Sequence, residues 1–239
     1  MHKCARTVDG SVWCWGLNVT GQIGDGTTDR RDLPVKVTLP NGSGTFVDIS
    51  AGGFSTCARA QGGSVWCWGA NESGQVGDGT LQNSRPSPVQ VTSVDISQVA
   101  EVIPAGDHSC ALMSNGSLRC WGSNIEGRLG DGTTEQGPKL ASVEVAVLGT
   151  SVVRSSGVCA IKSDSTLWCW GSNAWGQVGD GMTTNRTSPG EVTRLGSGVV
   201  EVSATFLRTC ARNKTGASGA GGAVAMVGSA MGPSTASPA

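Results

Sequence analysis

The sequence lacks an excess of charge of either sign, and it lacks long apolar runs. It has 17 Lys and Arg against 18 Asp and Glu, for a net charge of −1. Binding to nucleic acid or to an anionic membrane surface needs a cationic face, and a membrane-spanning helix needs about 18 consecutive apolar residues. We therefore expect no nucleic acid partner and no membrane insertion.

Metal-binding and catalytic patterns are also missing. Only two His are present, and none of the nine Cys has the CxxC spacing of a structural zinc site. His2 and His108 both stand two residues before a Cys, at equivalent positions of a repeat, whereas a catalytic His is ordinarily unique. We expect these His to hydrogen-bond within their own repeat unit. We expect no metal, no cofactor and no enzymatic activity.

What the chain does have is Gly, 37 of them, and eight Trp, which recur with a fixed period. The string VWCWG at 12–16 returns as VWCWG at 65–69, LRCWG at 118–122 and LWCWG at 167–171. Five residues after each final Gly a second motif begins, GQIGDGTT, GQVGDGT, GRLGDGTT and GQVGDG in turn. A Cys leads each unit at 4, 57, 110, 159 and 210. A fixed period of about 50 residues is the mark of a repeat architecture.

Each unit reads as four short strands separated by clusters of Gly, Pro, Asn and Ser. In the second unit the strands are predicted at 46–50, 56–59, 65–68 and 89–92. Four antiparallel strands in a unit of this length are typical of a propeller blade, while the repeats of a solenoid, the alternative, are usually shorter or helical. The Trp pairs of the repeats, two residues apart, share a strand face and are expected to pack between blades. The prediction is an all-β protein, a β-propeller of four-stranded antiparallel blades in an incomplete ring of about four to five blades.

These motifs resemble the regulator of chromosome condensation repeat family. The family pattern of a hydrophobic strand ending in Trp-Gly, then Asn, then Gly-Gln-Leu-Gly, is matched by Trp68-Gly69, Asn71 and the stretch 74–77. The match recurs in every complete unit and covers residues 1 to about 216, and the paired Cys resemble a bacterial type of the repeat. The resemblance implies a ring of seven blades, of which this chain holds a part.

Each complete unit holds two Cys ten residues apart, with a predicted hairpin between them. Three of the four three-residue hairpin loops end in Gly, the residue such loops favour at a left-handed third position. In this register the two Cys are directly opposed, about 4.5–5.5 Å apart at Cα, within the range of a disulfide. Disulfides indicate an oxidising setting, either extracellular, periplasmic or on the cell surface, whereas reduced thiols are the alternative. The predicted pairs are Cys4–Cys14, Cys57–Cys67, Cys110–Cys120 and Cys159–Cys169.

Cys210 leads a fifth unit that breaks off. Residues 1–216 follow the repeat, whereas 217–239 are rich in Ala, Gly, Ser and Pro, as disordered tails are. Reading the codons one nucleotide earlier gives GGT across Met226-Val227 and GGG across Met231-Gly232. Both encode Gly, at the distances from Cys210 that Gly21 and Gly26 have from Cys4. The hypothesis is that 217–239 is a frameshifted or disordered tail.

The loops between the repeated motifs supply the candidate binding residues. The dipeptide after the motif Asn changes in every unit while its flanks stay fixed, as expected of recognition positions on a constant frame. The longer loops carry Arg that either contact a partner or pack on the neighbouring blade. The Asp of each GDG motif, at 25, 78, 131 and 180, is expected to accept backbone N–H bonds in its own turn and not to bind calcium. The candidate partner-binding residues are Trp175, Glu72, Ile125, Arg30, Arg85 and Arg186.

No arrangement of catalytic residues emerges from the sequence, so the function is expected to be binding of an as yet unidentified protein. A non-catalytic scaffold, extracellular or at the cell surface, is the first reading. The resemblance implies a second one, a nuclear guanine nucleotide exchange factor and chromatin binder like the founding member of the family. A secreted enzyme inhibitor is a third reading, since bacterial beta-lactamase inhibitory proteins include a propeller with similar repeats. A carbohydrate-binding or hydrolytic propeller is the fourth, and it would need carboxylates and aromatics clustered on one face.

Overall fold

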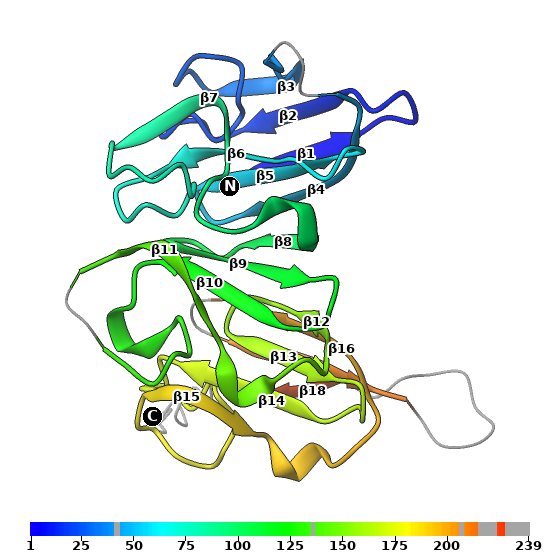
Figure 1. The fold of residues 1–239 in the computed structure, drawn as a ribbon, viewed down its shortest axis with the longest axis vertical. Coiled ribbons are helices and arrows are strands. Elements are labelled where there is room, and N and C mark those ends of the chain that lie inside the picture. Colours follow the sequence, from blue (N-terminus) through cyan, green and yellow to red (C-terminus); the bar gives the residue numbers. More distant parts are fainter. Residues whose placement is uncertain (41–43, 135–136, 206–207, 215–223, 228–239) are drawn as a thin grey trace, which may run out of the picture.

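The computed structural model describes residues 1–40, 44–134, 137–205, 208–214 and 224–227. Their strands form five antiparallel sheets, each built from consecutive strands. Figure 1 shows the first two sheets in the upper part of the molecule and the third below them, with the fourth and fifth sheets overlapping in the lower part. The first and last sheets lie at opposite ends of this arrangement, so the described sheets form an arc of a propeller.

The first sheet has three strands, the next three have four, and the last has three. Sheet one holds β1 His2–Arg6, β2 Val12–Gly16 and β3 Arg31–Lys36. Sheet two holds β4 Phe46–Gly52, β5 Ser55–Ala60, β6 Val65–Ala70 and β7 Ser84–Gln90. Sheet three holds β8 Val99–Pro104, β9 His108–Met113, β10 Leu118–Gly122 and β11 Lys139–Glu144. Sheet four holds β12 Val152–Ser155, β13 Cys159–Lys162, β14 Leu167–Gly171 and β15 Arg186–Glu191, and sheet five holds β16 Val199–Ala204, β17 Thr209–Asn213 and β18 Val224–Val227.

Helical structure in the described residues is confined to four single turns of 3-10 helix. None of them is long and apolar enough to cross a membrane. Their bounds are η1 Ile96–Gln98, η2 Ile125–Gly127, η3 Ala146–Leu148 and η4 Thr193–Leu195.

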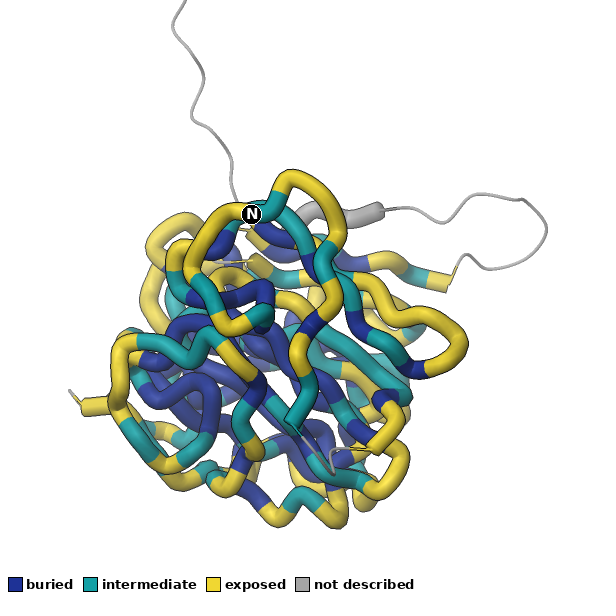
Figure 2. The backbone as a smooth tube through the Cα atoms, turned by 90° about the horizontal axis from the view of Figure 1, so that it is seen from above, coloured by how far each residue is buried: buried dark blue, intermediate teal, exposed yellow. Residues whose placement is uncertain are grey.

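The core lies between successive sheets, as expected for a propeller. One cluster joins Cys67 and Val91 of the second unit to Val102 and Trp121 of the third, and the other clusters join their units in the same way. Figure 2 shows buried backbone inside the molecule and exposed residues mainly in the loops. Because each sheet buries its faces on its neighbours, the repeat is stable only as a stack.

The first three strands of the second unit form where the sequence predicted them, but the fourth was predicted wrongly. It spans Ser84–Gln90, not 89–92. The strand contains Pro86 and Pro88, and Pro lacks the N–H that a ladder needs. It pairs on one side only, with β6, and an edge strand tolerates Pro for that reason.

The predicted hairpin register is confirmed in all four complete units. Cys4 faces Cys14, and the other three pairs are opposed in the same way. Thr7 N–H donates to the Ser11 carbonyl, and Cys4 lies three residues further along the ladder. It therefore falls at a non-hydrogen-bonded pair, where Cα atoms are closest. The Cα separations of the four pairs are 4.0–4.1 Å, and their sulfur atoms lie at disulfide distance.

Cys210 is the one Cys without a disulfide among the described residues. In the backbone register it stands opposite Met226, where the complete units oppose two Cys. The expectation for 217–239 lies outside the described residues except at β18, so the frameshift remains a hypothesis that the nucleotide sequence tests.

The fourth hairpin generates a stability prediction. Its third loop residue, Ser165, has φ +65°, whereas Gly10, Gly63 and Gly116 occupy this position elsewhere. A left-handed conformation costs an L residue about 1–2 kcal/mol, and Gly loses about 0.5–1 kcal/mol in backbone entropy. We expect Ser165→Gly to raise the free energy of unfolding by about 0.5–1 kcal/mol, measured from denaturant midpoints. Ser163→Gly in the same loop is the control and should lower it, and equal effects of the two changes would contradict this explanation.

Candidate protein-binding rim

Four loops join the third strand of a unit to its outer strand, and they emerge at the same side because every unit repeats the same strand directions (Figure 1). We call this side the loop rim. It comprises residues 17–30, 71–83, 123–134 and 172–185. The loops that precede β5 and β9 emerge at the same side.

A buried Asn fixes the start of each loop. The Asn18 side-chain N–H groups donate to the carbonyls of Thr27 and Asp29 at 3.0 and 2.9 Å, and its Oδ1 accepts from Ile23 N–H at 2.9 Å. The same side-chain oxygen accepts a backbone N–H five residues ahead in the other three units. These Asn are at most 1% exposed, so each loop is closed by a satisfied polar group inside the fold.

The motif Gln holds the variable dipeptide from its other side. Gln75 Oε1 accepts from Ser73 N–H at 2.9 Å, and Gln22 and Gln177 make the same bond in their units. Val19 and Trp175, in loops held by Gln, are 62% and 64% exposed, and Glu72 is also exposed. Ile125 is 56% exposed in the third unit, where Arg128 Nε donates to its carbonyl at 2.8 Å. The structure therefore leaves three of the predicted partner-binding residues exposed to solvent, Glu72 and Ile125 at the first position of the dipeptide and Trp175 at the second.

In the second, third and fourth units, the Trp before the motif Gly connects its sheet to the preceding loop. Trp68 Nε1–H donates to the Gln22 carbonyl at 3.0 Å, and Trp121 donates to the Gln75 carbonyl at 3.1 Å. Trp170 donates to the Arg128 carbonyl at 2.9 Å. All three indoles are buried. The loops of the rim are therefore hydrogen-bonded to side chains of the core.

The GDG Asp accepts hydrogen bonds inside its own turn, as predicted. Asp78 Oδ1 accepts from Thr80 N–H at 3.1 Å, and Oδ2 accepts from Arg85 Nε–H at 2.6 Å. Burial opposes ionisation, but the bonds from Thr80 and Arg85 hold the pKa of Asp78 below its ordinary value. Arg31 and Arg186 bind Asp25 and Asp180 in the same way. The guanidinium groups of Arg85 and Arg186 are thus engaged within their own units, whereas Arg30 is 74% exposed and pairs only with exposed Asp32 in the described structure.

The third unit has Arg128 where the others have Gln. Its Nη1 donates to both carboxylate oxygens of Asp107 at 2.6 and 2.5 Å, and Nη2 lies 3.2 Å from Glu126. The Arg128 side chain is 8% exposed. Burial disfavours the charged form of Asp107, but His108 and Arg128 lower its pKa to about 2. His108 Nδ1 lies 3.6 Å from Asp107, too far for a hydrogen bond, so we attribute the lowering mainly to Arg128.

The two His differ from the prediction. His2 Nε2 hydrogen-bonds Thr56 Oγ1 at 2.7 Å, on the next sheet rather than within its own unit. Both ring nitrogens of His108 are buried and without a hydrogen-bond partner in the described structure. The prediction of bonds inside the unit was wrong because both positions face the neighbouring sheet. No group of three or more His, Cys, Asp or Glu among the described residues is arranged to hold a metal ion.

Sequence reasoning missed several exposed apolar residues of the loop rim. Phe54 is 49% exposed, and its carbonyl accepts a hydrogen bond from Thr20 Oγ1 at 3.2 Å, which places it beside the first variable dipeptide. The signal was available, because Phe54 is replaced by Asp107 in the third unit after an unchanged Gly. Leu81 and Met182, after the GDG motif, are also exposed. Together with Val19, Ile125 and Trp175, they give this rim most of the large exposed hydrophobic side chains of the described residues.

The Asp107–Arg128 pair generates a prediction on pH. A folded-state pKa below the ordinary value stabilises the fold above about pH 4, and this contribution is lost as pH falls through about 2. Asp107→Asn should lower the free energy of unfolding at pH 7 by about 1–2 kcal/mol, since Arg128 loses a charged partner. At pH 2 the two proteins should differ much less in urea midpoint. Asp32→Asn, at an exposed pair, is the control and should change little at either pH, and a deficit in Asp107→Asn that is the same at both pH values would contradict the assignment.

Comparison with known proteins agrees with this geometry. A family model described as the regulator of chromosome condensation (RCC1) repeat matches residues 9–59, 62–112 and 164–205. The human E3 ubiquitin-protein ligase HERC2 is 32% identical over 138 residues, which are 57% of this chain and 3% of that protein.

Two solved structures share the fold. Human WBSCR16 superimposes with a TM-score of 0.74 at 22% identity, over 84% of this chain and 53% of that one. Prp20p from Saccharomyces cerevisiae superimposes with a TM-score of 0.72 at 20% identity, over 90% of this chain and 53% of that one. The chain thus spans about half the length of the solved relatives and a small part of the ligase. Its family matches cover more than half of its residues, on units with the strand order and loop geometry described above, and the chain belongs to the regulator of chromosome condensation (RCC1) repeat family.

Proposed function

We propose that this chain is a non-catalytic scaffold that binds another protein through the loop rim. The observation that carries the proposal is the pairing of a rigid frame with exposed, variable side chains. A buried Asn holds each loop, together with a Gln in three units and Arg128 in the third, while Val19, Ile125 and Trp175 project into solvent. Exposed polar loops are common on protein surfaces. Several large apolar side chains exposed on one side are rare in a protein that has no binding partner there. Trp is also a frequent anchor of protein interfaces.

Charge on the rim is mixed rather than cationic. Glu72 is exposed and Asp107 and Glu126 are partly exposed beside Arg128, which suits a protein surface better than a polyanion. The related Prp20p has binding properties to Gsp1p and histones. Protein binding by a related propeller is consistent with this proposal, and the partner of this chain is to be identified by experiment.

The rim is tested by removing its apolar side chains. We expect the triple change Val19→Ser, Ile125→Ser and Trp175→Ser to weaken capture of the partner at least roughly thirtyfold, since truncation of one interface anchor commonly costs about 2 kcal/mol. Affinity capture from the source organism with the full chain, followed by quantification of each retained protein, measures this.

The control carries Val8→Ser and Val147→Ser, which are exposed at the opposite side of the sheets. It should retain the partner that the triple variant loses. Partners that the triple variant and the wild type retain equally would rule out the loop rim as the binding surface.

We also propose that the protein works in an oxidising compartment, outside the cytosol. Four opposed Cys pairs at disulfide distance support this, because thiols in the cytosol and nucleus are kept reduced. Each disulfide of this loop length would contribute about 2–3 kcal/mol.

Alkylation at the moment of lysis tests the compartment. In protein from its native source, a blocking reagent should modify one of the nine Cys, Cys210, and all nine after reduction. The variant Cys210→Ser should show no modification before reduction. Modification of all nine Cys before reduction would favour the cytosolic or nuclear setting instead.

A further inference from the structure

The third sheet differs from its neighbours at one pair of positions. In the other complete units the second residue of the motif, on the third strand, is Trp13, Trp66 or Trp168, and in the third unit it is Arg119. The outer strand changes with it. Each of these Trp faces a residue of the outer strand. The residue two positions before that one is Pro34, Pro88 or Pro189, and in the third unit the matching residue is Ser142.

The Trp at this position fills the space between its own outer strand and the preceding unit. Trp66 packs on a cluster that includes Val37 and Phe46, and Trp168 packs on one that includes Val145 and Leu148. The N–H groups of these two indoles each have an acceptor two residues earlier. Trp66 donates to Ser64 Oγ at 3.2 Å, and Trp168 donates to Thr166 Oγ1 at 3.0 Å.

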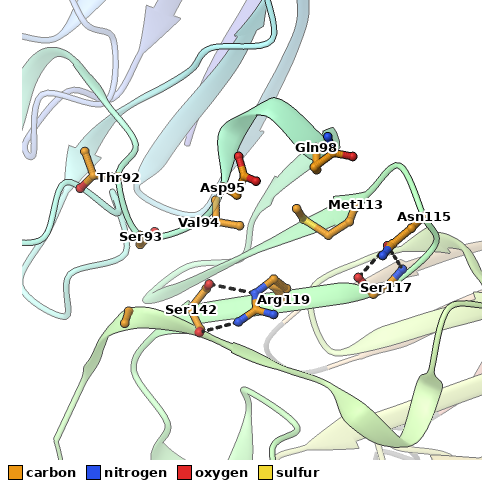
Figure 3. Close-up of a pocket in the computed structure, with 11 residues that line it drawn as sticks. Thr92, Ser93, Val94, Asp95, Gln98, Met113, Asn115, Ser117, Arg119 and Ser142 are labelled. Atoms are coloured by element: carbon orange, nitrogen blue, oxygen red, sulfur yellow. Dashed lines mark hydrogen bonds between the residues drawn. The ribbon is translucent and has the colours of Figure 1, made fainter.

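In the third unit this space is a groove of about 660 Å³ between the second and third sheets. Arg119 does not fill it, because its guanidinium turns to the outer strand. Its Nε donates to Ser142 Oγ at 3.1 Å and Nη2 to the Ser142 carbonyl at 3.2 Å, while Nη1 lies 3.6 Å from Glu144. Figure 3 shows Arg119 along one wall of the groove, with Met113 and Ser117 beside it and the segment 92–98 across from it.

The acceptor for an indole N–H is still present. Ser117 holds the position of Ser64 and Thr166, lines the groove and donates its own hydroxyl hydrogen to Asn115 Oδ1 at 2.8 Å. A hydroxyl oxygen that donates once retains lone pairs to accept. The third unit therefore keeps the hydroxyl acceptor, Ser117, although Arg119 replaces the Trp that would donate to it.

The remaining lining favours a planar, weakly polar occupant. Several polar groups are engaged with one another, since Asp95 accepts from Ser97 and Gln98 accepts from Ser114. The Arg119 bonds run in the plane of the guanidinium, which leaves its face for stacking on a ring. Met113 supplies a thioether, which makes favourable contacts with aromatic rings, and Val94 adds apolar surface. In the fourth unit a cation lies over the indole of Trp168, where Lys162, at the position of Met113, places Nζ 5.1 Å from the ring centroid.

We propose that this groove binds a tryptophan side chain of a partner protein. The side chain would occupy the same place in the third unit that Trp66 and Trp168 occupy in their own units. The indole stacks on Arg119, contacts Met113 and donates its N–H to Ser117 Oγ. The groove lies on the side of the hairpin loops, opposite the loop rim, so this site is separate from the one proposed above and does not depend on it.

The probe is N-acetyl-tryptophanamide, titrated into the oxidised full chain and followed by the NMR shifts of the Arg119 Nε–H and the amides of Met113 and Ser117. We expect saturable shifts with a Kd of roughly 0.1–10 mM, as suits a ligand of this size. N-acetyl-phenylalaninamide, which lacks the N–H, should bind more weakly, and N-acetyl-leucinamide should bind weakest. Ser117→Ala should weaken binding of the tryptophan amide by roughly three- to tenfold and leave that of the phenylalanine amide unchanged.

The matched variant Arg119→Trp with Ser142→Pro copies the neighbouring units and should fill the groove. We expect it to fold like them and to bind the tryptophan amide at least roughly tenfold more weakly. Absence of saturable shifts in the wild type, or equal binding by this double variant, would overturn the proposal. If the double variant does not fold, an unchanged affinity in Ser117→Ala overturns it. Stronger shifts with acetate, inorganic phosphate or glucose than with the tryptophan amide would also overturn it, in favour of a polar ligand.

Discussion

The structure depends on one contact repeated between sheets, the hydrogen bond from a buried indole N–H to a carbonyl of the preceding loop. Trp68, Trp121 and Trp170 each make it. The indole can approach only because the loop residue beneath it is Gly24, Gly77 or Gly130, where an added Cβ would lie 2.6–2.9 Å from the indole nitrogen. The contact therefore couples the packing of one sheet to the shape of the loop before it. Variation is left to the exposed dipeptide, whose residues neither donate nor accept this hydrogen bond.

The Cys pairs stabilise single hairpins and not the packing of one sheet on the next. Each joins two residues ten apart within one hairpin, so none of them links one sheet to the next. Cohesion between sheets rests on the indole contacts, on the apolar clusters and on polar contacts such as that from His2 to Thr56. A unit can therefore have an intact hairpin and still need its neighbours to bury its faces.

The third unit shows how much the repeat tolerates when the frame is kept. Arg128 replaces Gln and recruits Asp107, while its carbonyl still accepts from Trp170. Arg119 replaces Trp and bonds Ser142, while the inner positions of the same strand stay buried. One replacement builds a charged cluster on the loop rim, and the other opens a groove at the opposite side. Neither replaced side chain takes part in the indole contact, which uses only the carbonyl of Arg128.

The sequence by itself determined the repeat, the hairpin register and the role of the GDG Asp. These features are local: turn geometry and a ten-residue spacing decide whether Cys4 faces Cys14 and whether Asp78 accepts from Thr80. Only the tertiary structure decided where the outer strand of a unit runs, since Pro86 and Pro88 are acceptable there because no strand of the described residues pairs with the far side of β7. It also decided that His2 bonds the next sheet, that Arg85 is engaged in its own turn, and that the space beside Arg119 is open. Each of these contacts depends on which groups lie close together in the folded chain, and the spacing of residues along the sequence does not predict that.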